Sequence, residues 1–219
     1  MKQVVFLADF FSTDLIGGAE LNDSVLLDGL VSRGVKVIKL KTSDLTDEDV
    51  IKNDLFIVSN FVNLSERHKN MVMLKKYIIY EHDHKYVSNR NPAAFLDFKV
   101  PKEHLINVEF YKNAHAVVVL SDICKTVIED CLGIDNVTNI GCSLWSTDKL
   151  DTSNKNGKYC IINSSNPIKG TREAIAFCDK NGLDYELIGP LLEKELLEKL
   201  AKYDFVVFIP HVLETLSRV

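Results

Sequence analysis

The feature that most constrains the fold of this 219-residue chain is the alternation of short apolar runs with longer segments of helical periodicity. Strands that alternate with helices in this way indicate parallel sheets with helices on both faces, the α/β class. One expected helix, residues 122–132, follows Ser121, which is a natural N-cap. The other expected helices are residues 19–33, 171–181 and 191–203, and the expected strands are 4–8, 35–40, 55–59, 77–80, 117–120, 137–140, 159–162, 185–188 and 205–209.

The polar stretch 148–158 divides this alternation into two series and predicts a linker. We therefore expect an N-terminal Rossmann-like domain over residues 1–147 and a second, incomplete Rossmann-like domain over residues 159–219. The second series supplies only three strands, and a small parallel sheet of this kind leaves apolar surface and a strand edge uncovered. This predicts a homo-oligomer that associates through the exposed second sheet.

Composition and charge limit the compartment and the partners. The net charge is −5, which argues against non-specific nucleic-acid binding, so no nucleic-acid partner is expected. Five cysteines without a C-x-x-C pair argue against a disulfide scaffold and a zinc site, and they favour a reducing compartment. No transmembrane segment is expected, because no run approaches the ~20 apolar residues that span a bilayer. The expected location is cytoplasmic.

Two loops of the first series carry residues that suit ligand binding. The motif IGGAE places Gly17 and Gly18 before a helix, where the backbone can approach an anion, although a plain turn would look the same. The motif YEHDH places His82 after an apolar run, where it can donate to a substrate oxygen or phosphate. The alternatives are a histidine satisfied by a neighbouring carboxylate, or a metal site with His84 for which no third ligand is evident.

Two loops of the second series are also candidates. In SSNPIKG, Lys169 precedes a helix and suits a diphosphate, although an exposed lysine is the plain alternative. In PHVLETLSRV, Glu214 and Thr215 stand where a helix begins after a strand. An acidic residue there can accept hydrogen bonds from sugar hydroxyls while backbone N–H groups hold a phosphate. Its alternative role is to stabilise the helix dipole.

In their order along the chain, these motifs resemble those of the GT-B glycosyltransferases, specifically the retaining family 4 type. The early glycine loop is similar to Gly17-Gly18, and the histidine after a first-domain strand is similar to His82-Asp83. The family pattern A-D-x-V-x-x-x-S resembles NAHAVVVLS, R-x-x-x-x-K-G resembles SSNPIKG, and P-S-x-x-E resembles PHVLE. The resemblance implies two Rossmann-like domains, the first binding mainly the acceptor and the second mainly the nucleotide-sugar donor.

The resemblance also implies roles for single residues. Gly17 and Gly18 would approach the donor phosphates or the acceptor, and His82 would be the catalytic contact to the transferred sugar or the leaving phosphate. Lys169 would neutralise the diphosphate, while Glu214, with Thr215, would bind the sugar. Cationic side chains then replace a metal, so no cofactor is expected besides a donor substrate such as a UDP- or GDP-sugar. The acceptor would be a sugar, lipid or protein.

Several positions depart from the family pattern. Ser164 stands where the family has an arginine, and Leu216 and Ser217 replace glycines. The second glutamate of the family motif would fall at position 222, beyond Val219. We therefore expect a truncated glycosyltransferase with weak or no activity. A nucleotide-sugar epimerase of the same fold and a non-catalytic binding protein on a transferase fold are the alternatives.

Overall fold

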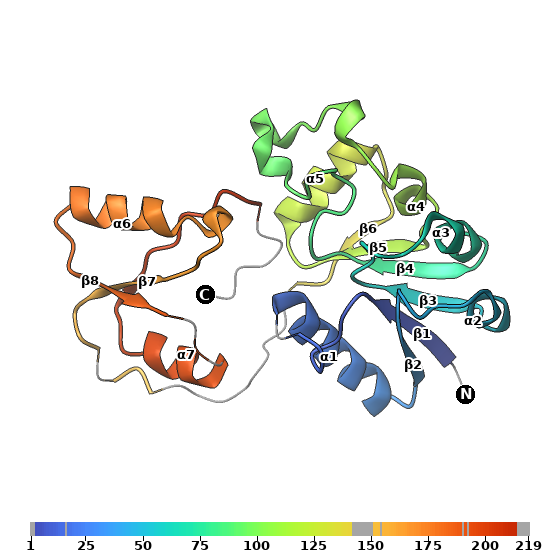
Figure 1. Ribbon diagram of the computed structural model, residues 1–219, viewed down its shortest axis with the longest axis horizontal. Helices are drawn as coiled ribbons and strands as arrows, with labels where there is room; N and C mark the ends of the chain where they lie inside the picture. Colours follow the sequence, from blue (N-terminus) through green and yellow to red (C-terminus); the bar gives the residue numbers. More distant parts are fainter. Residues whose placement is uncertain are drawn as a thin grey trace. The chain divides into compact units, whose positions relative to one another are not determined.

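The computed structural model describes residues 3–15, 17–141, 151–153, 155–189, 191 and 193–213. The chain forms two compact units, Met1–Trp145 and Ser146–Val219 (Figure 1). Of the predicted linker, positions 148–150 and 154 lie outside the described residues, so its role stays a prediction. Each unit is an α/β structure with a parallel sheet, and the predicted fold class is therefore confirmed.

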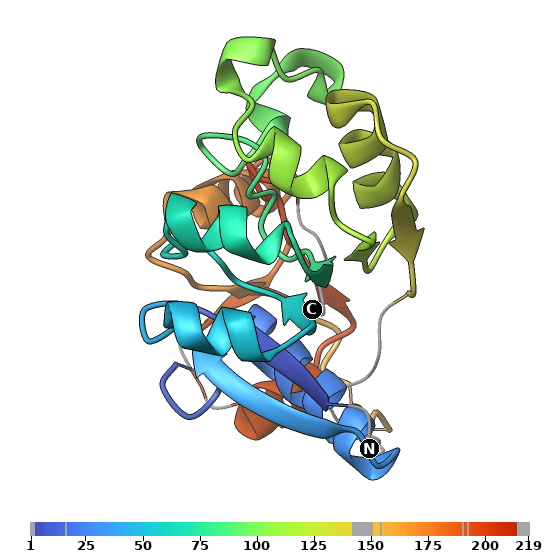
Figure 2. The same cartoon turned by 90° about the vertical axis from the view of Figure 1, so that its right-hand side faces the viewer.

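The first unit is built on a six-stranded parallel sheet whose strand order is β2-β1-β3-β4-β5-β6. The order begins with a reversal, because β1 pairs with β2 on one side and with β3 on the other (Figures 1 and 2). From β3 onward each strand lies beside the next one in the sequence. The strands are β1 Gln3–Ala8, β2 Lys36–Lys41, β3 Leu55–Val58, β4 Lys76–Tyr80, β5 Ala116–Val119 and β6 Val137–Asn139.

Side-chain caps begin helices α2, α3 and α5 of this unit. In α5 the Ser121 hydroxyl accepts a hydrogen bond from the Cys124 N–H at 3.4 Å, and Gly133 ends the helix with φ 62°. Thr46 and Asp49 form a capping box at the start of α2. The helices are α1 Gly18–Ser32, α2 Asp47–Lys52, α3 Glu66–Val72, α4 Val108–Lys112 and α5 Asp122–Leu132, with 3₁₀ turns η1 Pro92–Ala94, η2 Leu96–Phe98 and η3 Lys102–His104.

The main core of the first unit lies on one face of the sheet. Its strand residues are alternate positions, which point to the same face: Val5, Leu7, Phe56, Val58, Tyr77, Ile79, Val117 and Val119. Helices α2 to α5 contribute Val50, Val72, Phe110 and Ile128 to the same cluster. The connection from β1 to β2 runs across the sheet in the direction opposite to the later connections. Because such crossovers are right-handed, α1 lies on the face opposite to α2–α5.

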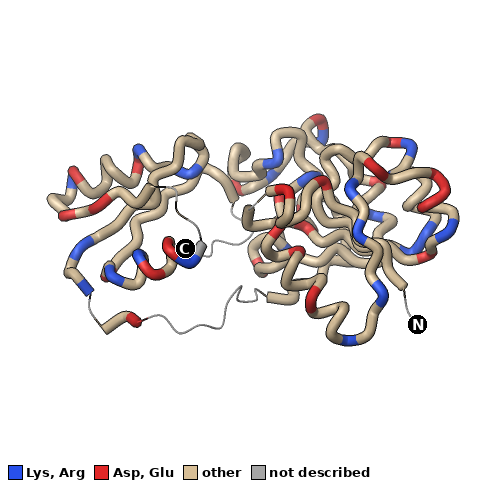
Figure 3. Tube along the Cα trace, turned by 60° about the horizontal axis from the view of Figure 1, so that its bottom comes forward, with Lys and Arg blue, Asp and Glu red and all other residues tan. Residues whose placement is uncertain are grey.

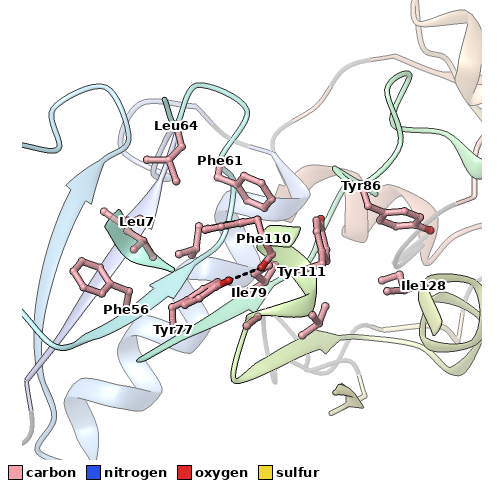
Figure 4. Close-up of a cluster of buried hydrophobic side chains, with 14 of the residues drawn as sticks. Leu7, Phe56, Phe61, Leu64, Tyr77, Ile79, Tyr86, Phe110, Tyr111 and Ile128 are labelled. Atoms are coloured by element: carbon pink, nitrogen blue, oxygen red, sulfur yellow. Dashed lines mark hydrogen bonds between the residues drawn. The ribbon is translucent and has the colours of Figure 1, made fainter. Parts of the chain in front are cut away.

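Aromatic side chains join this core to the segment that follows β3. The ring of Tyr77 stacks on Phe110 with centroids 4.9 Å apart, and its hydroxyl donates to the Phe110 carbonyl at 2.6 Å (Figure 4). Phe61 lies against Phe110 and Tyr111, with ring centroids 5.2 and 6.0 Å away. The buried phenol of Tyr77 thus has its hydrogen-bond partner, as a polar group in a core requires.

The second unit contains a three-stranded parallel sheet in the order β8-β7-β9. Cys160 and Ile188 pack with Tyr203 in one cluster, while Ile161 packs with Ala174 and Cys178 in another. Both β8 and β9 are edges of this sheet, and association through it stays a prediction. The elements are β7 Tyr159–Ile162, η4 Pro167–Lys169, α6 Thr171–Lys180, β8 Tyr185–Ile188, α7 Glu193–Leu200 and β9 Phe205–Val206.

The last described strand is shorter than the sequence predicts. We expected residues 205–209, but β9 comprises only Phe205 and Val206. The Val207 N–H still donates to the Cys160 carbonyl at 2.9 Å, and the chain then turns from the sheet toward the loop after β7. There the His211 N–H donates to the Ile168 carbonyl at 2.8 Å. Apolar composition alone could not show this departure.

Basic and acidic residues are interspersed along the trace of both units (Figure 3). Within the part of the chain that the structure describes, no helix has the length and apolar character needed to cross a membrane. Four cysteines are described, Cys124, Cys131, Cys160 and Cys178, and no disulfide joins them to one another.

Candidate functional site

The carboxyl ends of β1, β3 and β4 meet where the strand order of the first sheet reverses. In open α/β sheets the crevice outside the carboxyl ends at such a switch point is the usual ligand site. Asp9 follows β1, Ser59 follows β3, and Glu81 and His82 follow β4. The predicted residue His82 therefore lies at the edge where this fold binds ligands.

Asp9 serves the structure of this edge. Its Oδ2 accepts a hydrogen bond from the Val62 N–H at 2.7 Å, and its Oδ1 accepts one from the Asn63 N–H at 3.1 Å. The Thr42 hydroxyl also donates to Oδ1. The carboxylate therefore fixes the loop after β3 to the ends of β1 and β2, and its acceptor sites are largely used within the chain.

His82 is buried, with 5% of its surface exposed, and it contacts a carboxylate. Its Nε2 lies 3.1 Å from Oδ1 of Asp23, which comes from α1. The Tyr80 ring meets the imidazole edge-on, with centroids 4.3 Å apart. The carboxylate neighbour that we gave as an alternative for His82 is thus present. A carboxylate that orients an imidazole is also a common part of functional histidine sites.

Ser59 completes a chain of three polar groups, because its hydroxyl donates to the same Asp23 Oδ1 at 2.7 Å. The order is serine, aspartate, histidine, with the carboxylate in the middle. In a nucleophilic triad the serine must contact the imidazole, which takes its proton. Here the serine hydroxyl is directed to the carboxylate, so this group is not arranged for nucleophilic attack by Ser59.

Glu20, one helical turn before Asp23, adds a second buried carboxyl to the edge. Burial raises the pKa of Glu20. A hydrogen bond from its own backbone N–H lowers the pKa, but the nearby charges of Asp23 and Asp83 raise it further. An added Cβ at Gly17 would lie 2.5 Å from Glu20 Oε2, the end of a flexible side chain, so a larger residue there would require the Glu20 carboxylate to shift.

No contact in the described chain requires a glycine at position 18. Gly18 is the first residue of α1, and an added Cβ would meet none of the described atoms within 4 Å. The predicted approach of a ligand to this position stays a prediction.

A buried ion pair anchors the loop that carries His82. The Lys85 ammonium donates to Glu81 Oε1 at 3.2 Å, the Asp83 N–H donates to the same oxygen at 2.7 Å, and the Tyr111 hydroxyl donates to Oε2. The side chains of Glu81 and Lys85 are 0% and 2% exposed. Burial raises the pKa of Glu81, but Lys85 and the hydrogen bonds outweigh it and the pKa falls to about 2.

His84 does not join His82 at a common site. The backbone at His84 has φ 54°, so this segment is not extended and its alternate side chains do not share a face. His84 Nδ1 lies 3.1 Å from the Tyr86 hydroxyl, and its Nε2 lies 4.0 Å from Cys124 Sγ. Among the described residues, no cluster of three histidine, cysteine, aspartate or glutamate side chains could hold a metal ion.

In the second unit, the loop after β7 packs against the segment after β9. Gly170 has φ 67°, and a Cβ there would lie 1.6 Å from the Ile209 carbonyl oxygen. Together with the bond from His211 to Ile168, this close approach holds Lys169 at the carboxyl end of the sheet. Sequence reasoning singled out Lys169 and missed Gly170, although a glycine directly before a helix was a usable signal.

The remainder of this loop is held by short polar contacts. The Thr171 hydroxyl accepts from the Ser164 N–H at 3.1 Å, and the Ser164 hydroxyl accepts from the Asn166 N–H at 3.2 Å. Ser164, which stands where the family motif that the loop resembles has an arginine, thus forms part of the turn. Glu214 and Thr215 lie outside the described residues, so their predicted roles cannot be placed on this geometry.

Asp23, Glu20 and Ser59 are the residues of the first unit that sequence reasoning missed. Glu20 and Asp23 were detectable as carboxylates one helical turn apart behind a glycine loop. A surface hollow beside α7, lined in part by Glu186, Lys199 and Tyr203, includes none of the predicted site residues.

Comparison with known proteins gives a structural likeness and no sequence relative. No model of a known family matches the chain, and no curated protein matches it. Among solved structures, a similar one is an alpha-glucosyltransferase in complex with UDP and a 13-mer DNA containing a HMU base. It has 13% sequence identity and a TM-score of 0.56, and the match covers 93% of this chain and 71% of that chain. The likeness therefore shows the fold, and the predicted GT-B architecture is confirmed.

Proposed function

We propose that the protein is a glycosyltransferase that moves a sugar from a nucleoside diphosphate to an acceptor, with retention of anomeric configuration, in the manner of the retaining family 4 type. The fold match carries this proposal, because it spans 93% of the chain and the similar protein binds UDP. The loops that carry His82 and Lys169 support it, since each follows the carboxyl end of a parallel strand. Fold alone does not determine chemistry, so the roles below rest on the motifs.

On the donor side, Lys169 stabilises the charge of the departing diphosphate. Its loop is anchored to the segment after β9, because Gly170 packs on the Ile209 carbonyl and the Ile168 carbonyl accepts a hydrogen bond from the His211 N–H. The N-terminus of α6 directly follows and favours an anion. Glu214 and Thr215, three and four residues after His211, bind the sugar hydroxyls and a phosphate. In this proposal cationic groups act in place of a metal ion.

On the acceptor side, His82 contacts the transferred sugar or the leaving phosphate, and Gly17 and Gly18 allow the backbone to approach the substrates. The network of Glu81 and Lys85 supports this role because it fixes the loop. A preorganised donor or acceptor of hydrogen bonds contributes to catalysis when it needs no rearrangement during the reaction.

The acceptors to be tested include nucleic acids as well as a sugar, lipid or protein. The net charge of −5 led us to exclude a nucleic-acid partner. The similar structure contains a DNA, which counts against excluding nucleic acids on net charge alone. Short oligonucleotides therefore belong among the acceptors to be tested.

Calorimetry with UDP and with GDP tests the donor site. We expect one of the two nucleotides to bind, and we expect Lys169→Ala to weaken it about tenfold, the value of one charge-assisted hydrogen bond. Lys180→Ala is the matched control, because it removes an exposed lysine from the other end of α6. Binding of neither nucleotide to the wild-type protein would contradict the proposal.

Turnover assays separate the proposal from its alternatives. Incubation with UDP-glucose or the corresponding GDP-sugar and an acceptor is expected to give a glycoside with the donor's anomeric configuration by NMR. We expect the rate to be unchanged by EDTA. An altered sugar nucleotide formed without any acceptor would favour the epimerase. A non-catalytic binding protein would be favoured by two results together. The wild type would show no turnover, and the double variant His82→Ala with Lys169→Ala would still bind the nucleotide.

A further inference from the structure

Asp23 is a buried carboxylate whose two oxygens have very different surroundings. It lies on α1 with 1% of its surface exposed. Its Oδ1 accepts from the Ser59 hydroxyl at 2.7 Å and contacts His82 Nε2 at 3.1 Å. Its Oδ2 has no hydrogen-bond partner among the described residues. A buried carboxylate oxygen without a partner is unfavourable for folding, so fold stability alone does not explain this aspartate.

The electrostatic surroundings of Asp23 point the same way. Its charge adds to the burial that raises the pKa of Glu20, one turn earlier on the same helix. An apolar residue of similar size would avoid both this repulsion and the unpartnered oxygen. The contact with His82 is therefore the feature that accounts for a carboxylate at this position.

We propose that Asp23 is a positioning residue for His82. It accepts a hydrogen bond from Nε2–H and so fixes both the orientation of the ring and its tautomer. Ser59 in turn fixes the carboxylate, since its hydroxyl donates to the same oxygen. These three residues come from the end of β3, from α1 and from the end of β4, which ties the histidine to three elements of the sheet edge.

The tautomer defines how His82 meets a substrate, and this step rests on the proposed function. With Nε2–H directed to Asp23, the neutral ring can engage a substrate only through Nδ1, which is an acceptor. An acceptor suits a hydroxyl group and does not suit a phosphate oxygen. Nδ1 is buried in the protein as described, so a substrate reaches it only after neighbouring side chains move. The tautomer then pairs the neutral His82 with a hydroxyl of the transferred sugar and not with a phosphate oxygen.

A double-mutant cycle tests whether Asp23 acts through His82. Asp23→Asn keeps the shape of the side chain and removes its charge. We expect it to lower kcat for UDP-glucose turnover about 10- to 100-fold, with a much smaller change in KM. In the His82→Ala background the same change is expected to alter kcat less than about twofold, because the residue it positions is gone. Asp28→Asn, an exposed site on α1, is the charge-matched control.

Proton NMR of the ring tests the contact without any turnover. We expect a slowly exchanging Nε2–H resonance from His82, identified by its loss in His82→Gln, that shifts in Asp23→Asn and stays in place in Asp28→Asn. If wild-type protein turns over no sugar nucleotide, the proposed function fails while this measurement still decides the contact.

Either of two results would overturn the proposal. One is a His82 resonance that Asp23→Asn leaves unchanged. The other is an equal loss of kcat from Asp23→Asn in the wild-type and His82→Ala backgrounds, which would mean that Asp23 supports only the fold.

Discussion

Replacing Gly170 by alanine should dislodge the segment after β9 from the loop that carries Lys169. Two separate penalties add at this position. The residue has φ 67°, and an alanine in this left-handed region is disfavoured by about 1–2 kcal/mol. In addition, its Cβ would lie 1.6 Å from the Ile209 carbonyl oxygen, where ordinary contact begins at 3.4 Å. The carbonyl must therefore move by about 1.8 Å, the difference between these two distances.

Such a movement breaks the hydrogen bond from the His211 N–H to the Ile168 carbonyl, now 2.8 Å long. Its loss costs about 1 kcal/mol. With the backbone strain, we expect Gly170→Ala to lower the free energy of unfolding of the second unit by about 2–3 kcal/mol. The same displacement disturbs Lys169, so UDP binding should weaken as well.

Gly182→Ala is the matched control, because Gly182 has φ 63° and an added Cβ there meets none of the described atoms within 4 Å. Gly182→Ala therefore introduces the left-handed backbone strain without a steric clash. Urea denaturation measures both variants, and hydrogen exchange of the His211 amide reports the local detachment. If the two variants are equally destabilised, or if the His211 amide keeps its wild-type protection in Gly170→Ala, the close packing of this loop does not hold.

Three further predictions concern the first unit. Lys85→Met should destabilise the protein by about 3–5 kcal/mol in urea denaturation, because it leaves Glu81 buried without its cation; adding Glu81→Gln should restore part of the loss. Since the folded pKa of Glu81 is lowered from 4.5 to about 2, its contribution is fully present above pH 4.5 and lost as the pH falls toward 2. The stability of Glu81→Gln should therefore fall less than that of the wild type between pH 5 and 3, and parallel curves would refute the low pKa. Ser121→Ala should lower the free energy of unfolding by about 0.5–1 kcal/mol in the same assay, because the α5 cap is lost. An unchanged free energy of unfolding would mean that the 3.4 Å contact does not stabilise the helix.

Local signals were sufficient for elements whose ends are set by their own residues. The bounds of α5 were predicted from Ser121, because a hydroxyl before a helix and a glycine after it act within the sequence itself. The strands β7 and β8 were predicted from their apolar runs for the same reason. The short helices α2, α3 and α4 were missed, since helices of this length depend on tertiary packing more than on propensity.

The site was predictable only in part, because its contacts join distant positions. His82 could be selected by its place after an apolar run, but its partner Asp23 lies 59 residues away. Spacing along the chain does not show which helix face meets which strand end. Gly170 shows the same limit, because the reason for its glycine is the Ile209 carbonyl, 39 positions later in the sequence.

The strand order of the first unit has a consequence for how the protein can fold during synthesis. Among the strands of this sheet, β1 leaves the ribosome first. It is an inner strand that needs β2 and β3 as neighbours, and all three are complete by Val58. Every later strand adds to one growing edge in the order of translation, so no strand has to insert between two that are already paired. Vectorial synthesis and sheet growth thus run in the same direction, and few unpaired edges are exposed at any time.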